Sequence, residues 1–131
     1  MNRTPVNPWP WSLNHGYNQA ELVEGATRHL ICAGQTGVDA TGAPQHSGDM
    51  RGQIGLALDN LAAVLAAAGM GLANVVRLTV YTTDVDLALQ HFDLLGQRMG
   101  RVGAAPPMTL LGVTRLALPS LMIEFEATAA A

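Results

Sequence analysis

The sequence predicts an α+β fold in which a mixed β-sheet carries two helices on one of its faces. Two segments repeat apolar side chains at helical spacing, and each precedes a segment whose composition is typical of a strand. Helices that alternate with strands favour a mixed sheet with both helices packed on the same side. Because 131 residues can bury one core and are few for two, we expect a single domain over residues 1–131.

The predicted order of elements is β-β-α-β-α-β-β. Residues 1–16 hold three prolines and two tryptophans, which indicates an extended N-terminal arm with a first short strand. We expect strands at 19–24 and 28–33, joined by a tight turn at 25–27. Turn-forming residues then fill the stretch 38–45 and separate these strands from the first helix.

The first helix has a recognisable start, face and end. Asp49 or Ser47 can accept hydrogen bonds from its free N–H groups, and Gly69 and Gly71 can end it. Apolar residues at spacings of four, three and four define the buried face: Ile54, Leu58, Leu61 and Leu65.

A strand at 73–83 follows, with side chains that alternate between two faces. Val76, Leu78 and Val80 are predicted to face the core. The opposite face then carries Arg77, Thr79 and Tyr81.

A second helix begins near Asp84 or Asp86 and ends before Pro106-Pro107, which prevents its continuation. Two more strands, at 109–116 and 121–128, complete the sheet. The apolar stripe of this helix is Ala88, His91/Phe92, Leu95 and Met99.

Composition narrows the choice of partners. Hydrophobic residues make up 49% of the chain and charged residues only 13%, so we expect part of the apolar surface to face another subunit. All seven basic residues are arginines without a cluster, and the net charge is −3, so nucleic acid is not an expected partner.

The expected compartment is the cytoplasm. The single Cys32 excludes an internal disulfide framework and suits a reducing environment. The chain shows no apolar run of signal-peptide or membrane-span length, so we expect no membrane partner.

Four segments together follow the pattern of a known family. They are HGYNQA at 15–20, CAGQT at 32–36, VVRLTVYTTDVD at 75–86 and RLALPSLMIEFEATA at 115–129. In this order and spacing they resemble the reactive intermediate deaminase (Rid/YjgF) family over nearly the whole chain. The resemblance implies a chorismate-mutase-like fold, a homotrimer with clefts between subunits that hold a small-molecule metabolite, and no metal or organic cofactor.

The best-known members of that family hydrolyse reactive enamines and imines, such as 2-aminoacrylate, to 2-keto acids and ammonia. The resemblance implies that Glu124, on the last strand, positions or activates water and that Tyr17 lines the cleft as a second catalytic residue. It also assigns four positions to the substrate-binding wall: Gly34, Phe92, Met108 and Thr109.

Two polar site positions of the family are apolar in this chain. The arginine that binds the substrate carboxylate falls on Met108, and an asparagine of active members falls on Phe92. A guanidinium offers a fork of donors that matches a carboxylate, whereas a thioether offers none. Losing such an anchor costs roughly 1.5–3 kcal/mol of binding. We therefore expect a retained cleft with a changed specificity, and no 2-aminoacrylate activity.

The residues by themselves allow other interpretations. Glu124 and Glu126 alternate with apolar residues and share one face of their strand, which could be a solvated edge. Tyr17 could be a half-buried interface aromatic, and Gly34 could belong to an ordinary strand-end turn.

The two tryptophans also have two interpretations. Trp9 and Trp11 could anchor the N-terminal arm by burial, or one of them could line an apolar cleft together with Met108 and Phe92.

Two functions of different classes remain. The first is an enzyme that adds water to, or moves a proton within, a small unstable C=N or C=C compound in a cleft between subunits. The second is a trimer that binds a metabolite in the same cleft without converting it. An endoribonuclease activity, a label attached to this family, is disfavoured by the absence of lysine and the net charge of −3.

Overall fold

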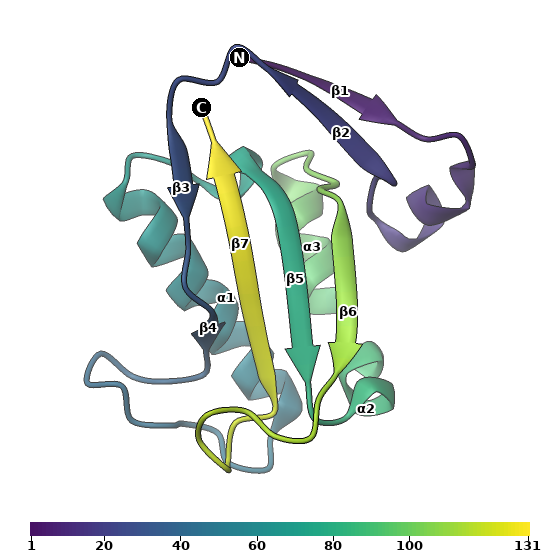
Figure 1. Ribbon diagram of the computed structural model, residues 1–131. Coiled ribbons are helices and arrows are strands. Elements are labelled where there is room, and N and C mark those ends of the chain that lie inside the picture. The colour runs from purple at the N-terminus through teal and green to yellow at the C-terminus, as the bar shows by residue number, and fades with distance from the viewer.

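A mixed sheet with the helices behind it and a separate two-stranded hairpin make up the structure (Figure 1). The computed structural model describes residues 1–131. The strands are β1 (Asn2–Val6), β2 (Ala20–Glu24), β3 (His29–Ile31), β4 (Gln35–Thr36), β5 (Val75–Thr82), β6 (Met108–Gly112) and β7 (Ile123–Ala130). The α-helices are α1 (Met50–Ala67), α2 (Val85–Gln90) and α3 (Asp93–Arg101), and η1 (Pro10–His15) and η2 (Leu72–Asn74) are short 3-10 helices. The α+β class predicted from the sequence is confirmed.

The main sheet has the strand order β3-β7-β5-β6, and β4 also pairs with β7. β7 runs antiparallel to β5, β3 and β4, whereas β5 and β6 are parallel. Parallel neighbours require a crossover connection, which α2 and α3 supply on the side of the sheet where α1 also lies (Figure 1). No helix is both long and apolar enough to cross a membrane.

The N-terminal arm is more structured than the sequence predicts. β1 pairs antiparallel with β2 to form the hairpin. The chain between them turns through the 3-10 helix η1, which the sequence pattern does not predict. The guanidinium of Arg3 fastens the hairpin to the main sheet. It pairs with the carboxylate of Glu21 at 2.6 Å and donates to the carbonyl oxygens of Ala73 and Val75.

The predicted second helix is two helices, so the expectation of one continuous helix is wrong. α2 ends at Gln90 and α3 begins at Asp93, with the break at His91 and Phe92. Arg51 of α1 holds the new start, because its guanidinium donates two hydrogen bonds of 2.8 Å to the carboxylate of Asp93. These partners lie 42 residues apart in the sequence, so helical periodicity does not reveal the break.

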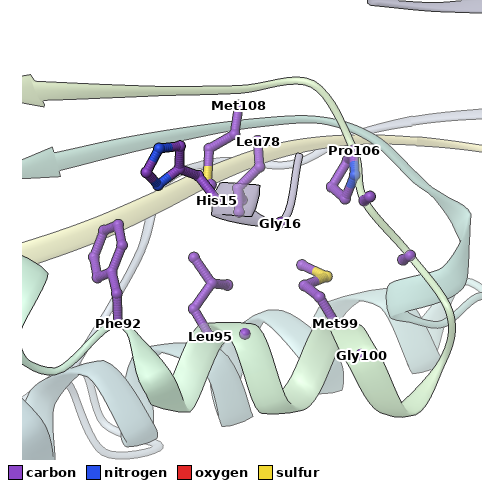
Figure 2. Close-up of a pocket in the computed structure, with 12 residues that line it drawn as sticks. His15, Gly16, Leu78, Phe92, Leu95, Met99, Gly100, Pro106 and Met108 are labelled. Carbon is purple, nitrogen blue, oxygen red and sulfur yellow. The ribbon is translucent and has the colours of Figure 1, made fainter. Parts of the chain in front are cut away.

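The apolar side chains at the start and along one side of α3 face the sheet. Figure 2 shows Phe92, Leu95 and Met99 pointing from this segment toward Met108 and Leu78 on the strands.

Strand boundaries differ from the predicted ones where a pairing partner ends or continues. β6, predicted to end at residue 116, stops at Gly112. Its partner β5 ends at Thr82, directly opposite Gly112. The last strand begins at Ile123 instead of 121 and runs on to Ala130, where it pairs with His29. β4 was not predicted, since two residues are too short to show an alternation.

The prediction that Val76 of β5 faces the core is wrong. A register shift between Val75 and Arg77 brings Val75 fully into the core and leaves Val76 half-buried. A bulge adds a residue to one strand and thereby changes the alternation locally. Beyond the bulge the predicted pattern holds, with Leu78 and Val80 buried on the helix side.

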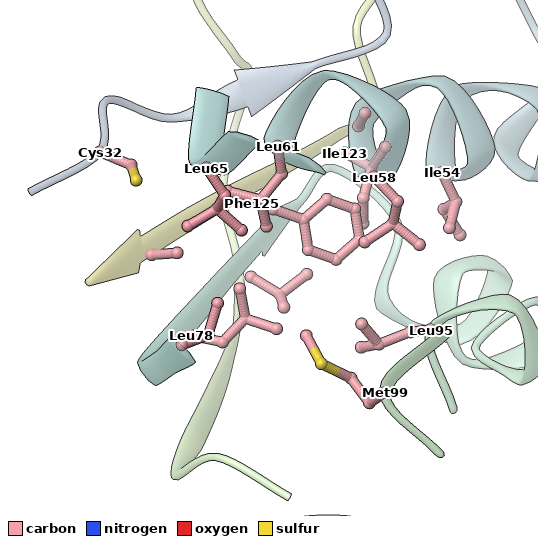
Figure 3. Close-up of a cluster of buried hydrophobic side chains, with 14 of the residues drawn as sticks. Cys32, Ile54, Leu58, Leu61, Leu65, Leu78, Leu95, Met99, Ile123 and Phe125 are labelled. Atoms are coloured by element: carbon pink, nitrogen blue, oxygen red, sulfur yellow. The ribbon is translucent and has the colours of Figure 1, made fainter. Parts of the chain in front are cut away.

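The core lies between the sheet and α1, with α3 closing one side (Figure 3). All four residues of the predicted face of α1 are completely buried: Ile54, Leu58, Leu61 and Leu65. Figure 3 places the ring of Phe125, from β7, among them. Burial of each such side chain contributes on the order of 1.5–3 kcal/mol.

A buried glutamine ties α1 to two loops. The Gln53 amide nitrogen donates to the carbonyl oxygens of His46 at 3.2 Å and Ser120 at 2.8 Å. Its amide oxygen accepts from the backbone N–H of Met122 at 2.8 Å. Gln53 is completely buried, so these groups have no water to replace a lost partner.

We expect Gln53→Ala to lower the free energy of unfolding by roughly 2–4 kcal/mol, because it leaves buried backbone groups unpaired. Urea unfolding followed by circular dichroism measures the change. Gln97→Ala is the matched control on the exposed side of α3 and should change stability by less than about 0.5 kcal/mol. Equal losses in the two variants would contradict the assigned role.

Candidate functional site

Two carboxylates lie on the face of the sheet opposite the helices. Along β7, Glu124 and Glu126 alternate with the buried Ile123, Phe125 and Ala127. Glu124 lies directly opposite Tyr81 of β5 and Thr36 of β4. Glu126 accepts a hydrogen bond of 3.1 Å from the Tyr81 hydroxyl, and no side chain donates to Glu124.

Gly34 lies directly against the Glu124 carboxylate. A methyl group built on Gly34 would stand 1.9 Å from Oε1 of Glu124, so any larger residue would displace this side chain. The adjoining β4 segment is held from behind by Asn60 of α1. Its amide nitrogen donates to the carbonyl oxygens of Thr36 at 2.8 Å and Val38 at 2.9 Å.

The pKa of Glu124 is raised above its ordinary value. Partial burial is the larger cause, because it disfavours the charged form, and the nearby negative charge of Glu126 adds to it. The hydrogen bond from Tyr81 to Glu126 also raises the pKa of the Tyr81 hydroxyl. A carboxyl group with a raised pKa takes up and releases protons closer to neutral pH than an ordinary glutamate does.

A separate cavity of about 380 Å³ opens beside η1 and β6. It is bounded by His15, Tyr17, Leu89, Phe92, Met108 and Leu110. Met108 faces this cavity because it pairs with Leu78 and therefore points to the helix side of the sheet (Figure 2).

A smaller chamber of about 170 Å³ continues inward between β6 and α3. It shares His15, Phe92 and Met108 with the outer cavity. Leu78, Leu95, Met99 and Pro106 also border it (Figure 2).

The six residues predicted for the site fall into three places within one subunit. Glu124 and Gly34 are together on the open face, beside β4. Tyr17, Phe92 and Met108 are together around the cavity on the helix side. The third place is that of Thr109, which is exposed and points to the open face, opposite Thr79. The strand β5 separates β7 from β6, so one subunit does not bring Glu124 and Met108 into contact.

Sequence reasoning missed several residues that shape the cavity. Leu89 and Leu110 line it, and neither was singled out because each is an ordinary apolar residue of a predicted helix or strand. Trp11 is about half exposed and meets the Tyr17 ring edge-on, with ring centroids 6.2 Å apart. Trp9 is 62% exposed, so within one subunit neither tryptophan anchors the arm by burial.

No group of three or more His, Cys, Asp or Glu side chains is arranged to hold a metal ion. Cys32 is buried, and burial raises the pKa of its thiol, so it has the character of a core residue. Around the predicted site residues, the chemical groups that face a ligand are the Glu124 carboxylate on the open face and the aromatic and apolar side chains of the cavity.

The family model described as Endoribonuclease L-PSP matches residues 12–131. A crystal structure of a Rid-family protein of unknown function, YyfB from Yersinia pestis, superposes with a TM-score of 0.86 and 34% identity over 100% of both chains. The crystal structure of Escherichia coli TdcF with bound serine has a TM-score of 0.70 and 26% identity, and the match covers 88% of this chain and 87% of that one.

Among curated relatives, the mitochondrial protein mmf2 of Schizosaccharomyces pombe is 34% identical over 87 residues. This match covers 66% of the present chain and 64% of mmf2, so the chain spans less than two thirds of that relative. The fold and these matches define the class, a small α+β protein of the YjgF type. The chain belongs to the Rid/YjgF family. Membership supports a role in binding or processing a small molecule.

We expect the raised pKa of Glu124 to make the folded state less stable as the pH rises. The folded state holds the proton more tightly than the unfolded state, whose pKa is near the ordinary 4.5. The contribution of Glu124 to the free energy of unfolding therefore falls between pH 4.5 and the raised pKa, and it is constant above the raised pKa. Glu124→Gln should remove this decline, which unfolding in urea between about pH 4 and pH 8 measures.

Glu126→Gln is the matched control, because it removes the negative charge of Glu126, which is the smaller cause of the raised pKa of Glu124. The pKa of Glu124, followed by NMR titration in that variant, should move part of the way back to its ordinary value. Identical pH profiles of wild type and Glu124→Gln would show that Glu124 titrates normally.

Proposed function

We propose that this protein hydrolyses or tautomerises a small reactive enamine or imine in a cleft between subunits, and that 2-aminoacrylate is not its substrate. The observation that carries the proposal is the separation of the site into two halves. A carboxyl group of raised pKa lies on one face of the sheet, and an apolar cavity lies on the other. The open face has the acidic group but not the cavity, and the cavity has no acidic side chain.

A homotrimer, as the family implies, would bring the two halves together. In this arrangement Glu124 and Gly34 of one subunit face Tyr17, Phe92 and Met108 of the next. The exposed apolar residues of the open face support an interface there, since Ile31 is 75% exposed and Leu111 is 45% exposed. Because Gly34 has no side chain, the Glu124 carboxylate fits against its backbone on that face.

The proposed reaction uses Glu124 as the proton carrier. Its carboxylate accepts a proton from water as the water oxygen bonds to the imine carbon, and the proton then passes to the nitrogen. The resulting carbinolamine loses ammonia and leaves a carbonyl compound, so one imine and one water give one ketone or aldehyde and one ammonia. For an enamine, the protonated carboxyl group first delivers its proton to carbon, and the resulting carboxylate takes a proton back from the nitrogen, so that the imine forms. Tyr17, at the cavity, would position the substrate.

Met108 argues against substrates with a carboxylate in this position. Its side chain offers no hydrogen-bond donor, and none of the residues around the cavity is an arginine or a lysine. The TdcF structure with bound serine shows that a similar protein binds a molecule as small as an amino acid. In the present chain we propose a substrate that lacks the carboxylate or carries it elsewhere.

The alternative is a trimer that binds the metabolite without converting it. The loss of the carboxylate anchor at Met108 favours it, and Glu124 with its raised pKa favours the enzyme. Ligand-induced stabilisation without product in a mass spectrometer would identify the binding protein.

Met108→Arg should create activity on 2-aminoacrylate. The guanidinium supplies the missing anchor, so we expect at least about a tenfold gain over a near-inactive wild type. Ammonia and keto-acid release from freshly generated imines, with and without a carboxylate, measures it. Met108→Leu is the control that keeps the wall apolar. If both wild type and Met108→Arg are inert on every imine, the deaminase proposal is wrong.

Glu124→Gln should reduce the rate on whichever imine the wild type accepts by about 10²–10⁴-fold, because the amide cannot accept the proton. Glu126→Gln, two residues away on the same face, should retain most of the activity. An unchanged rate in Glu124→Gln would refute the assigned proton carrier and leave the binding role of the cavity intact.

A further inference from the structure

The inner chamber has no role in the reaction proposed above. It holds about 170 Å³ between β6 and α3, behind the Met108 position. The outer cavity and the chamber together contain no Asp, Glu, Lys or Arg side chain. A charged group placed there would lose part of its hydration without gaining an oppositely charged carboxylate, guanidinium or ammonium partner, so the chamber favours an uncharged occupant.

The chamber owes its space to glycines on α3. This helix presents Phe92, Leu95 and Met99 to the chamber, and Gly96 and Gly100 on the same face. A Cβ atom added to either glycine meets nothing within 4 Å, so packing does not require them. Glycine is, after proline, the poorest helix-forming residue. Two of them in a nine-residue helix weaken it and leave room in front of the helix.

Aromatic rings surround the entrance. Figure 2 shows the rings of Phe92 and His15 on either side of the opening, with Met108 beside them. Tyr17 lines the outer cavity, and Trp11 supports its ring edge-on. Aromatic rings and a thioether make favourable contacts with another aromatic ring. They offer few hydrogen-bond partners to a small polar ligand.

We propose that this chamber is a substrate-side-chain pocket, and that the substrate carries an uncharged aromatic ring next to the reactive carbon–nitrogen bond. This inference rests on the function proposed above, because it names the substrate class of the same cleft. The ring would pass between Phe92 and His15 into the space in front of Gly96 and Gly100. The carbon–nitrogen bond would then stay in the outer cavity, beside Met108 and Tyr17.

Binding of stable model compounds to the full-length protein tests the pocket without requiring turnover. Phenylacetamide has the ring and a planar, uncharged carbon–nitrogen bond, acetamide lacks the ring, and phenylacetate replaces the amide with a charge. Calorimetric titration should give a dissociation constant for phenylacetamide at least about tenfold lower than for acetamide or phenylacetate. Equal binding of phenylacetamide and acetamide would overturn the inference.

Filling the chamber provides the second measurement. Gly96→Ala and Gly100→Ala should each weaken phenylacetamide binding about tenfold, because the added methyl group occupies the ring's place. Gly55→Ala is the matched control, since Gly55 lies in α1 with open space around its Cα and outside the chamber. All three variants should unfold at the same temperature as the wild type or higher, because alanine favours the helix.

The outcomes also separate this inference from the proposed reaction. If phenylacetamide binds as expected but no aromatic imine is hydrolysed, the pocket stands and the deaminase activity does not. If Gly96→Ala and Gly100→Ala bind phenylacetamide as tightly as Gly55→Ala, the chamber does not hold the ring. If they instead lower the oligomer mass in light scattering and the wild type binds no phenylacetamide, a neighbouring subunit fills the chamber and the inference is wrong.

Discussion

The antiparallel pairing of β5 with β7 is the constraint on which the rest of the structure depends. It fixes seven residues of each strand in register, so that every second side chain faces the helices. On the helix side this alternation delivers Val80 and Phe125 to the core. On the other side it delivers Glu124 and Glu126 to an open face, next to Tyr81 and Thr79. One ladder of backbone hydrogen bonds thus builds the core and positions the carboxylates.

The site keeps features that work against stability. Partial burial of Glu124 near a second carboxylate opposes its ionisation in the folded protein, and Gly34 gives up a side chain where that carboxylate packs against the backbone. Gly96 and Gly100 weaken α3 where alanine would fit. These costs gather around the two halves of the proposed cleft, and such local inconsistencies are expected at functional sites.

The importance of Met108 for the proposed specificity depends on the residues around it. An isolated methionine on a strand is an ordinary core residue. Here it borders an uncharged cavity with Phe92 and opens onto a chamber between β6 and α3. No Asp, Glu, Lys or Arg side chain lines either space, and this uncharged lining supports the proposed change of specificity.

Local sequence patterns determined the elements that depend on local forces. Spacing alone located α1 and its buried face, because an amphipathic helix must turn its apolar stripe to the core. Alternation likewise identified β5 and β7 and the shared face of Glu124 and Glu126, apart from one bulge. Glu124, Tyr17 and Met108 were selected as site candidates through family resemblance, and their patterns alone also fitted ordinary structural roles.

Tertiary structure decided what depends on residues far apart in the chain. Arg51 joins α1 to Asp93 at the start of α3. Gln53 and Asn60 hold loops against α1, and β6 ends where its partner β5 ends. Only the folded chain shows that Glu124 and Met108 lie on opposite faces of the sheet. Periodicity assigns a residue to a face of its own element. It does not say which element covers that face or how much space remains between them, because packing across the whole chain sets both.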